Sequence, residues 1–456
     1  MKKQFGTDGV RGEANEKLTP TLAYRIGAAL AGILKKETAR PVIAVGRDSR
    51  RSGDMLEGAL AAGITARGGV MRRLGVIPTP AVSSYLRQHD LAAGIVISAS
   101  HNPFYDNGIK IFGADGRKFP DDKENELEMI LAGEEPLALC HKEEIGWVED
   151  HPEGAEEYLQ RLQGFFPLDL SGYRLVVDTA NGATSDYAPK LLRALGAEVI
   201  AMNCDYDGLN INKNCGSTKP DAMAAKVKAV SADLGIAYDG DGDRLIMADH
   251  TGAIVDGDMA MGLMAKYLKE KGELKENRLV VTVMSNLGLK LAMKGLDIDL
   301  SETAVGDKNV MVEMDRTGAV LGGEQSGHLI LSQYNPTGDG ILSSLMVLKI
   351  IAETGKSLKE LAAVMTPLPQ ILYNITVSRR DDWTANEAVQ AAIHKAEALL
   401  AGKGRILVRP SGTEPLLRVM GEGPDTAELD GILKDILAVM EKELNDESRN
   451  ILKGSE

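Results

Sequence analysis

The sequence contains little cysteine, few aromatic residues and no long apolar stretch. Its three cysteines, Cys140, Cys204 and Cys215, form neither a metal-ligand spacing nor an even set of disulfide partners, so a reducing cytoplasm is the expected location. No apolar run approaches the roughly 20 residues that a membrane helix needs. The basic start, residues 1–3, is not followed by the apolar segment of a secretion signal, so we expect no export.

Basic residues are also fewer than acidic ones. The sequence has 52 Lys and Arg residues and 66 Asp and Glu residues, which gives a formal net charge of −14. This balance argues against nucleic acid or an anionic membrane as a partner. A small anionic substrate remains compatible with it, because the field in a pocket depends on the few side chains that line the pocket. With aromatic residues at only 4%, the cores must be built from aliphatic side chains and methionine.

What the chain does contain is a repeated plan of strand, helix and strand. At 456 residues it is too long for one hydrophobic core. Residues 42–71, 175–200 and 279–298 each begin with an apolar strand, continue through a helix rich in Ala and Leu, and end in a second strand, expected at 296–298 in the third copy. Strands that alternate with helices indicate βαβ units in parallel or mixed sheets. We therefore predict three related α/β domains.

The chain beyond residue 365 is predicted to form a smaller α+β domain. Two prolines within residues 365–370 forbid a helix there and favour an extended link. The predicted elements after the link are a strand at 371–377, a helix at 383–400, a strand ending at Val408 and a helix from Thr426.

Two further junctions divide the rest of the chain. The acidic, turn-rich residues 141–157 are interpreted as a connector, and a second junction is placed near residues 249–256. The predicted domains are therefore 1–145, 155–252, 253–365 and 370–447.

A polar loop follows the predicted buried strand at residues 94–97. The loop is SASHNP, residues 98–103, and its composition alone is typical of a turn. Lys110 follows a few residues later, after an Asn-Gly pair. A phosphoryl group on Ser100 would carry about two negative charges and three acceptor oxygens, so this loop is a candidate for phosphoryl transfer.

An acidic loop, DGDGDR, follows the apolar stretch 234–238. The ends of strands are where ligands bind in open α/β sheets. Asp239, Asp241 and Asp243 alternate with glycines that let the backbone curl, so three carboxylates can converge. Such like charges repel unless a cation lies among them, and oxygen ligands that leave room for water and phosphate suit Mg²⁺. A calcium loop does not fit, because Arg244 and His250 stand where that motif needs Gly and Glu.

Two later glycine-containing loops are suited to binding a sugar phosphate. In GEQSGH, residues 323–328, Glu324 and Ser326 offer both acceptors and donors for vicinal hydroxyls, and His328 can relay a proton near neutral pH. In RPSGTEP, residues 409–415, hydroxyls and open backbone N–H groups lie between basic side chains that can clamp oxyanions. The phosphate-binding candidates are Arg409, Ser411, Gly412, Thr413 and Arg418.

These four loops, in this order, resemble those of the α-D-phosphohexomutase superfamily, and the resemblance covers essentially the whole chain. The stretches FGTDGVRG (5–12) and ISASHNPFYDNGIK (97–110), with Gln325 in GEQSGH, are most similar to the members that act on glucosamine phosphate. Members that act on glucose or mannose phosphate more often have Met at the position of Gln325. In VGDKNV, Lys308 and Asn309 stand where the family usually has Arg and Tyr, which keeps the positive charge but leaves open how this loop meets the sugar.

The resemblance implies three related mixed α/β sandwich domains and a fourth α+β domain, of TATA-binding-protein-like fold, around a central cleft. It implies an isomerase that interconverts glucosamine 6-phosphate and glucosamine 1-phosphate by phosphoryl transfer from a phosphoserine through a 1,6-bisphosphate. That reaction feeds the synthesis of UDP-N-acetylglucosamine and peptidoglycan. Mg²⁺ is the expected cofactor, a glucosamine or glucose 1,6-bisphosphate is the expected activator, and a homodimer is common in the family. The fourth domain, on its proline link, is the expected moving part.

Residue roles follow from the resemblance, position by position. The expected catalytic side chains are Ser100, His101, Lys110, Arg11 and Arg244. The expected metal ligands are phosphorylated Ser100, Asp239, Asp241 and Asp243. The expected substrate-binding residues are Glu324, Ser326 and His328 for the sugar, and Arg409, Ser411, Gly412, Thr413 and Arg418 for the phosphate that is not reacting.

Three alternatives remain open from the sequence. The nearest is a phosphoglucomutase or phosphomannomutase of the same superfamily. The others are a metal-dependent phosphatase that uses Ser100 as its nucleophile, and a sugar-phosphate sensor that binds without chemistry. The histidines outside the four loops are interpreted as surface or packing residues: His89, His141, His151, His250 and His394.

Overall fold

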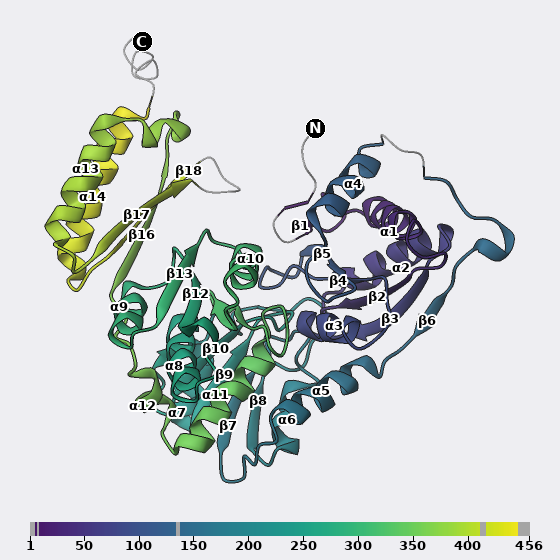
Figure 1. The fold of residues 1–456 in the computed structure, drawn as a ribbon, viewed down its shortest axis with the longest axis horizontal. Coiled ribbons are helices and arrows are strands. Elements are labelled where there is room, and N and C mark those ends of the chain that lie inside the picture. The colour runs from purple at the N-terminus through teal and green to yellow at the C-terminus, as the bar shows by residue number, and fades with distance from the viewer. Residues whose placement is uncertain (1–4, 7–8, 134–136, 411–415, 446–456) are drawn as a thin grey trace. The chain divides into compact units, whose positions relative to one another are not determined.

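The computed structural model describes residues 5–6, 9–133, 137–410 and 416–445 (Figure 1). The chain groups into two compact units. The first contains Met1–Ser285 and Met293–Val364, and the second contains Asn286–Ala292 and Met365–Glu456. Three β-sheets belong to the first unit and a fourth belongs to the second.

The first sheet has six strands in the order β1-β5-β4-β2-β3-β6, at Val10–Glu13, Asp106–Gly113, Ala93–Ile97, Val42–Arg47, Val70–Val76 and Val148–Asp150. The β2 strand pairs in parallel with β3 and β4, whereas β5 pairs antiparallel with β1 and β4. The helices of this region are α1 (Pro20–Leu34), α2 (Ser52–Ala66), α3 (Thr79–Leu86), α4 (Asp121–Leu131) and the 3₁₀ helix η1 (Lys142–Glu144). All of β4 is buried, so the polar loop after Ile97 begins inside the protein.

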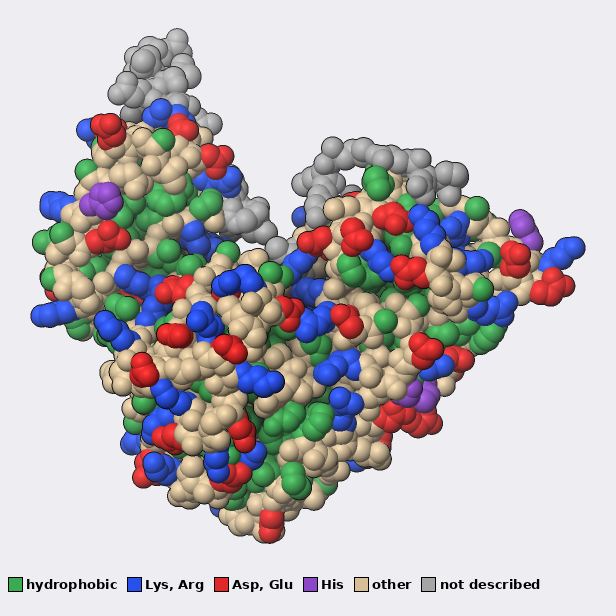
Figure 2. Space-filling view, in the orientation of Figure 1, with side chains coloured by type: hydrophobic (Ala, Val, Ile, Leu, Met, Phe, Trp, Pro, Cys, Tyr) green, Lys and Arg blue, Asp and Glu red, His purple; other side chains and the backbone are tan. Residues whose placement is uncertain are grey.

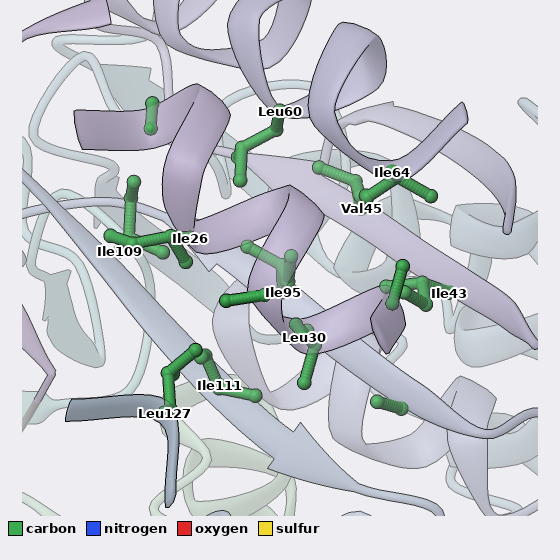
Figure 3. Packing of buried hydrophobic residues seen from close by; sticks show 14 of the residues in the cluster. Ile26, Leu30, Ile43, Val45, Leu60, Ile64, Ile95, Ile109, Ile111 and Leu127 are labelled. Carbon is green, nitrogen blue, oxygen red and sulfur yellow. The ribbon is translucent and has the colours of Figure 1, made fainter. Parts of the chain in front are cut away.

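Aliphatic side chains fill the space between this sheet and its helices (Figure 3). Ile26 and Leu30 of α1 and Leu60 of α2 are fully buried with Ile43 of β2 and Ile95 of β4. Each such side chain contributes about 1.5 to 3 kcal/mol through its burial. The strands whose ends carry the polar loops are therefore anchored in a well-packed hydrophobic core.

The second sheet has the order β11-β10-β9-β7-β8, at Ile254–Val255, Leu245–Asp249, Leu234–Tyr238, Arg174–Asp178 and Glu198–Met202. Its helices are α5 (Gly154–Phe165), α6 (Ala188–Ala194) and α7 (Asp221–Ala229). The third sheet has the order β13-β12-β14-β15, at Asp299–Thr303, Arg278–Thr282, Leu321–Gly323 and Leu329–Leu331. The helices of this part of the chain are α8 (Gly257–Glu270), η2 (Lys275–Asn277), α9 (Leu287–Gly295), α10 (Asp307–Thr317), α11 (Gly340–Thr354) and α12 (Leu358–Ala362), and most of α9 belongs to the C-terminal unit.

The C-terminal unit contains an antiparallel sheet in the order β16-β18-β17, at Gln370–Thr376, Leu416–Glu422 and Arg405–Pro410. Its helices are η3 (Arg380–Thr384), α13 (Glu387–Leu400) and α14 (Thr426–Glu443). Alternate residues of β16 are exposed and half-buried, which is the pattern of a sheet with one solvated face. The two long helices share a core with the strands, including Val389, Leu417 and Leu433.

The expected fold class, three α/β regions followed by a smaller α+β region, is confirmed. One local prediction was wrong, one predicted connector contains a strand, and one strand was not predicted. Residues 296–298 form a turn in which Asp297 has a φ of +52°, so the strand begins only at Asp299. The supposed connector at 141–157 contains β6, which pairs with the edge of the first sheet. The β18 strand, which pairs with both β16 and β17, was not predicted.

Acidic and basic side chains are interspersed over the face of the protein drawn in Figure 2. Among the described residues, no helix has both the length and the apolar character needed to cross a membrane.

Candidate active site

Ser100 lies in the loop that leaves β4 and has an uncommon backbone conformation. It is buried, and its φ of +51° places it in the left-handed region, which costs a residue with a side chain about 1 to 3 kcal/mol. Its carbonyl oxygen accepts hydrogen bonds from Arg50 Nη2 and from Asn212 Nδ2, each at 2.8 Å. These contacts hold the loop in a conformation that it would not adopt alone.

Arg50 holds the Ser100 loop from inside and was missed by the sequence analysis. The guanidinium is fully buried and pairs with Asp48, with 2.8 Å between Nε and Oδ2. It donates to the backbone carbonyls of Ser100, Asn102, Pro103 and Asp106. The Asp48 carboxylate also accepts from Ser98 Oγ at 2.6 Å, while burial raises its pKa in spite of the arginine. In the sequence, the one indication of this role was GRDSR, a charged run at the end of a buried strand.

The acidic loop follows β9 and brings three buried carboxylates together. Oxygen atoms of Asp239, Asp241 and Asp243 lie within 4.8 Å of one another. A side chain at Gly240 would place its Cβ 2.6 Å from the carbonyl oxygen of Ser100, so only glycine permits this approach. The two loops therefore meet at the ends of β4 and β9.

Hydrogen bonds connect the serine to the carboxylates. Ser100 Oγ donates to Asp239 Oδ2 at 2.6 Å. Lys110, on β5, donates to Asp241 Oδ2 at 2.9 Å and lies 3.7 Å from Asp243 Oδ2. Thr79, at the start of α3, also donates to Asp241 Oδ2, at 2.6 Å.

The carboxylate cluster fits a divalent cation. Burial, and then the charges of the neighbouring carboxylates, raise the pKa of Asp239 and of Asp243. Within the described residues Asp243 Oδ1 is buried and makes no hydrogen bond. A hard cation that takes oxygen ligands would stabilise the charged carboxylates and would give the Asp243 oxygen a partner. The cluster is thus suited to a metal cofactor.

His101 lies beside the serine and is neutral at pH 7. Its Nδ1 is 3.4 Å from Ser100 Oγ. Burial, together with the charges of Arg244, Arg11 and Lys110, lowers its pKa to about 4. These three cations, all placed in the site by the sequence analysis, make the surroundings of Ser100 favourable for an anion. Arg11 reaches this region because β1 pairs with β5, with Arg11 opposite Gly108.

The GEQSGH loop joins β14 to β15 and is attached to the acidic loop. Leu245 N donates to the carbonyl of Gly327 at 2.9 Å. His328 is buried, its Nε2 lies 3.9 Å from Asp243 Oδ2, and neither ring nitrogen makes a hydrogen bond with the described residues. Glu324 Oε1 accepts from the backbone N–H of Gly306, and Ser326 is exposed.

A cavity of about 240 Å³ lies beside His328. Lys118, Asp307 and Lys308 line it, and Lys118 Nζ is 2.6 Å from Asp307 Oδ1. Lys308, which departs from the family pattern, therefore brings a positive charge to this cavity. The first three candidate loops are thus brought together in one unit.

The fourth loop belongs to the C-terminal unit. Arg409 on β17 and Arg418 on β18 are directly opposite each other in the antiparallel pairing. Burial, and then the charge of Arg418, lower the pKa of Arg409. Neighbouring guanidinium groups of this kind are suited to an anion. Ser411, Gly412 and Thr413 lie outside the described residues, and the strand before them extends to Pro410 rather than ending at Val408.

Domain models of one protein family match nearly the whole chain. In chain order they are phosphoglucomutase/phosphomannomutase alpha/beta/alpha domain I at residues 2–137, domain II at 156–252, domain III at 256–368, and the C-terminal domain at 372–439.

Curated relatives and solved structures agree with these matches. A phosphoglucosamine mutase of Heliobacterium modesticaldum is 49% identical, covering 97% of this chain and 100% of that protein. One of Carboxydothermus hydrogenoformans is 50% identical with the same coverage. A phosphoglucomutase/phosphomannomutase family protein of Burkholderia thailandensis superposes with a TM-score of 0.81 at 24% identity, over 98% of this chain and 99% of that one. The Aspergillus fumigatus N-acetylphosphoglucosamine mutase, in complex with GlcNAc-6P and magnesium, has a TM-score of 0.71 at 18% identity, over 97% and 96% of the two chains.

Proposed function

Because the chain belongs to the phosphoglucomutase/phosphomannomutase family, we propose that it is the isomerase that interconverts glucosamine 6-phosphate and glucosamine 1-phosphate. The observation that carries this proposal is the hydrogen bond from Ser100 Oγ to Asp239 within a cluster of three buried carboxylates. The choice of glucosamine over glucose or mannose phosphate is supported by relatives of that name at about half identity over nearly the full chain.

Ser100 is the proposed carrier of the phosphoryl group. A phosphoserine brings nearly two negative charges and three acceptor oxygens. Lys110, Arg11 and Arg244 supply positive charge close to this side chain, since each of them lowers the pKa of the adjacent His101. The Arg50 clamp keeps the serine backbone in place, so that its oxygen faces the carboxylates.

Asp239, Asp241 and Asp243 are the proposed ligands of Mg²⁺, together with the phosphate on Ser100. When bound, the ion draws negative charge from the transferring phosphoryl group. Lys110, which contacts two of these carboxylates, holds them in position, and its positive charge also acts on His101 beside the serine.

The chemistry requires one proton to be moved in each half of the reaction. A sugar hydroxyl oxygen bonds to phosphorus, the bond between phosphorus and Ser100 Oγ breaks, and the proton lost by the hydroxyl ends on the serine oxygen. Neutral His101, 3.4 Å from that oxygen, can take and return this proton. The resulting 1,6-bisphosphate then returns its other phosphoryl group to Ser100 by the same exchange in reverse.

Substrate recognition must tolerate both orientations of the sugar. Glu324, Ser326 and His328 are proposed to bind the sugar hydroxyls, and both ring nitrogens of His328 are available for this. The phosphate that is not reacting is proposed to bind in the C-terminal unit, at Arg409, Ser411, Gly412, Thr413 and Arg418. Recognition of phosphate alone suits a site that must accept either end of the intermediate.

We also propose that the enzyme is cytoplasmic and forms a homodimer, which is common in this family. Its product would supply the synthesis of UDP-N-acetylglucosamine and peptidoglycan. A sugar 1,6-bisphosphate would restore any enzyme that has lost its phosphate.

A direct test follows glucosamine 1-phosphate by ³¹P NMR with Mg²⁺ and a trace of glucosamine 1,6-bisphosphate. We expect conversion to the 6-phosphate, slower turnover of glucose 1-phosphate, and a phosphate on Ser100 in peptide mapping of active protein. Ser100→Ala should lose nearly all turnover, while Ser378→Ala, in the exposed C-terminal region, should keep it. Accumulation of inorganic phosphate instead would favour the phosphatase, and faster turnover of glucose or mannose phosphate would favour the other mutases.

A further inference from the structure

A second group of metal-ligating side chains lies away from the three carboxylates. It consists of His89, just after α3, His151, just after β6, and Glu157 on α5. The sequence analysis interpreted both histidines as surface or packing residues, and they are 62 positions apart in the chain. The fold brings them together with a carboxylate.

The three side chains converge on one point. His89 Nε2 is 2.7 Å from Glu157 Oε2, and His151 Nε2 is 3.0 Å from Glu157 Oε1. One ligand atom from each residue lies within 4.8 Å of the other two. The side chains are 28%, 31% and 31% exposed, so an ion in solution can reach them.

The surrounding structure holds both imidazole rings in place. Tyr85 is buried and stacks on His89, with 3.9 Å between the ring centroids. The backbone N–H of His151 donates to the carbonyl of Arg73 on β3, at 2.8 Å. Glu153 Oε2 lies 3.9 Å from His151 Nδ1, on the nitrogen that does not face Glu157. This distance is too long for a hydrogen bond, but the carboxylate adds negative charge beside His151.

The donor set selects a particular class of ion. Two imidazole nitrogens and one carboxylate, with solvent on the open side, are typical of zinc sites with three protein ligands. Imidazole favours zinc and other first-row transition metals, whereas oxygen ligands alone favour magnesium. The chain therefore carries two groups of different preference, one for a hard ion at Asp239, Asp241 and Asp243 and one for a softer ion here.

We propose that His89, His151 and Glu157 form a binding site for a transition-metal ion, with Zn²⁺ as its best match. The ion would connect α3 and the end of β6, which belong to the first sheet region, to α5, which precedes the second sheet. The bound ion would restrain the short segment of chain that connects these two regions. The proposal is independent of the proposed mutase activity.

The test is a titration of the full-length, tag-free protein with Zn²⁺ in excess Mg²⁺, read with a competing chromogenic zinc indicator. We expect a single site that is weakened at least about tenfold in His89→Ala and in Glu157→Gln. The matched controls are His250→Ala, an exposed histidine, and Glu156→Gln, an exposed carboxylate one position earlier on α5, and both should bind as the wild type does.

A second readout does not depend on affinity. With Co²⁺ in place of Zn²⁺, the wild type should develop the visible absorption of cobalt bound to imidazole, and His151→Ala should not. Equal Zn²⁺ binding by the site variants and the controls, or absence of the cobalt spectrum in the wild type, would overturn the proposal and leave Glu157 as a hydrogen-bonding partner of two histidines. Because glutamine has the size of glutamate, Glu157→Gln tests the site without removing packing volume.

Discussion

At Arg50, one buried guanidinium group donates to four backbone carbonyls of the Ser100 loop and pairs with Asp48. Removing one member of a buried ion pair leaves an uncompensated charge, which costs about 3 to 5 kcal/mol. Arginine rather than lysine is needed here, because its planar group offers five N–H donors, whereas the lysine ammonium offers three from a single nitrogen.

We expect Arg50→Met to lower the free energy of unfolding by about 3 to 5 kcal/mol and to reduce turnover by loosening the loop. Urea unfolding followed by circular dichroism measures the first effect. Arg51→Met is the matched control, because the Arg51 side chain is exposed and, among the residues that the structure describes, donates to the Asp207 carbonyl alone. If the free energies of unfolding of the two variants differed by less than about 1 kcal/mol, the Arg50 hydrogen bonds and ion pair would contribute little to stability.

Cys215 provides a second prediction at the scale of one residue. Burial, and then the charge of Asp178, raise the pKa of its thiol to about 12, so it stays protonated in the folded protein up to pH 9. Thiolate is the reactive form. We expect iodoacetamide at pH 8.5 to label the exposed Cys204 and to spare Cys215 until urea unfolds the chain, as read by peptide mass spectrometry. Equal labelling of the two in native protein would contradict this.

At the scale of elements, the polar loops lie where buried strands end. The strands β4 and β9 are buried in the same unit. The loops that follow them are in contact, because Ser100 Oγ donates to Asp239 Oδ2. The β17–β18 hairpin is different, since its strands place Arg409 and Arg418 opposite each other. Like charges directly opposite in a sheet are destabilising, and a bound anion would relieve the repulsion between them.

We expect Arg418→Gln to raise the KM for glucosamine 1-phosphate by at least about tenfold, the effect of losing one charge-assisted hydrogen bond. Steady-state kinetics measure this effect. Lys403→Gln, an exposed cation in the turn before β17, is the control, and an equal rise in its KM would point to a general loss of charge.

At the scale of the whole molecule, the three buried carboxylates of the first unit link the stability of the fold to the binding of a cation. Burial and mutual repulsion disfavour the charged forms of Asp239 and Asp243 and raise the pKa of each. A ligand that binds only the folded state stabilises it by about 2.7 kcal/mol at one hundred times its dissociation constant.

We therefore expect Mg²⁺ to raise the thermal midpoint of the full chain, and EDTA to reverse this and to abolish turnover. Asp241→Asn should remove the effect of Mg²⁺, whereas Asp205→Asn, an exposed residue, should leave it unchanged. Differential scanning fluorimetry measures the midpoint, and an equal response of the two variants would contradict the assignment of the three carboxylates.

Apolar periodicity and short polar motifs are local properties, so the fold class and the candidate loops could be predicted from the sequence. The local errors occurred at residues 296–298, where a turn with a positive φ replaces a strand, and at β18, where pairing with two strands rather than a local pattern specifies the backbone. The contacts of Arg50 with Ser100 and of His89 with Glu157 could not be predicted and became visible in the fold. They join positions at least 50 residues apart, and the packing of sheets and helices, rather than any local pattern, brings such positions together.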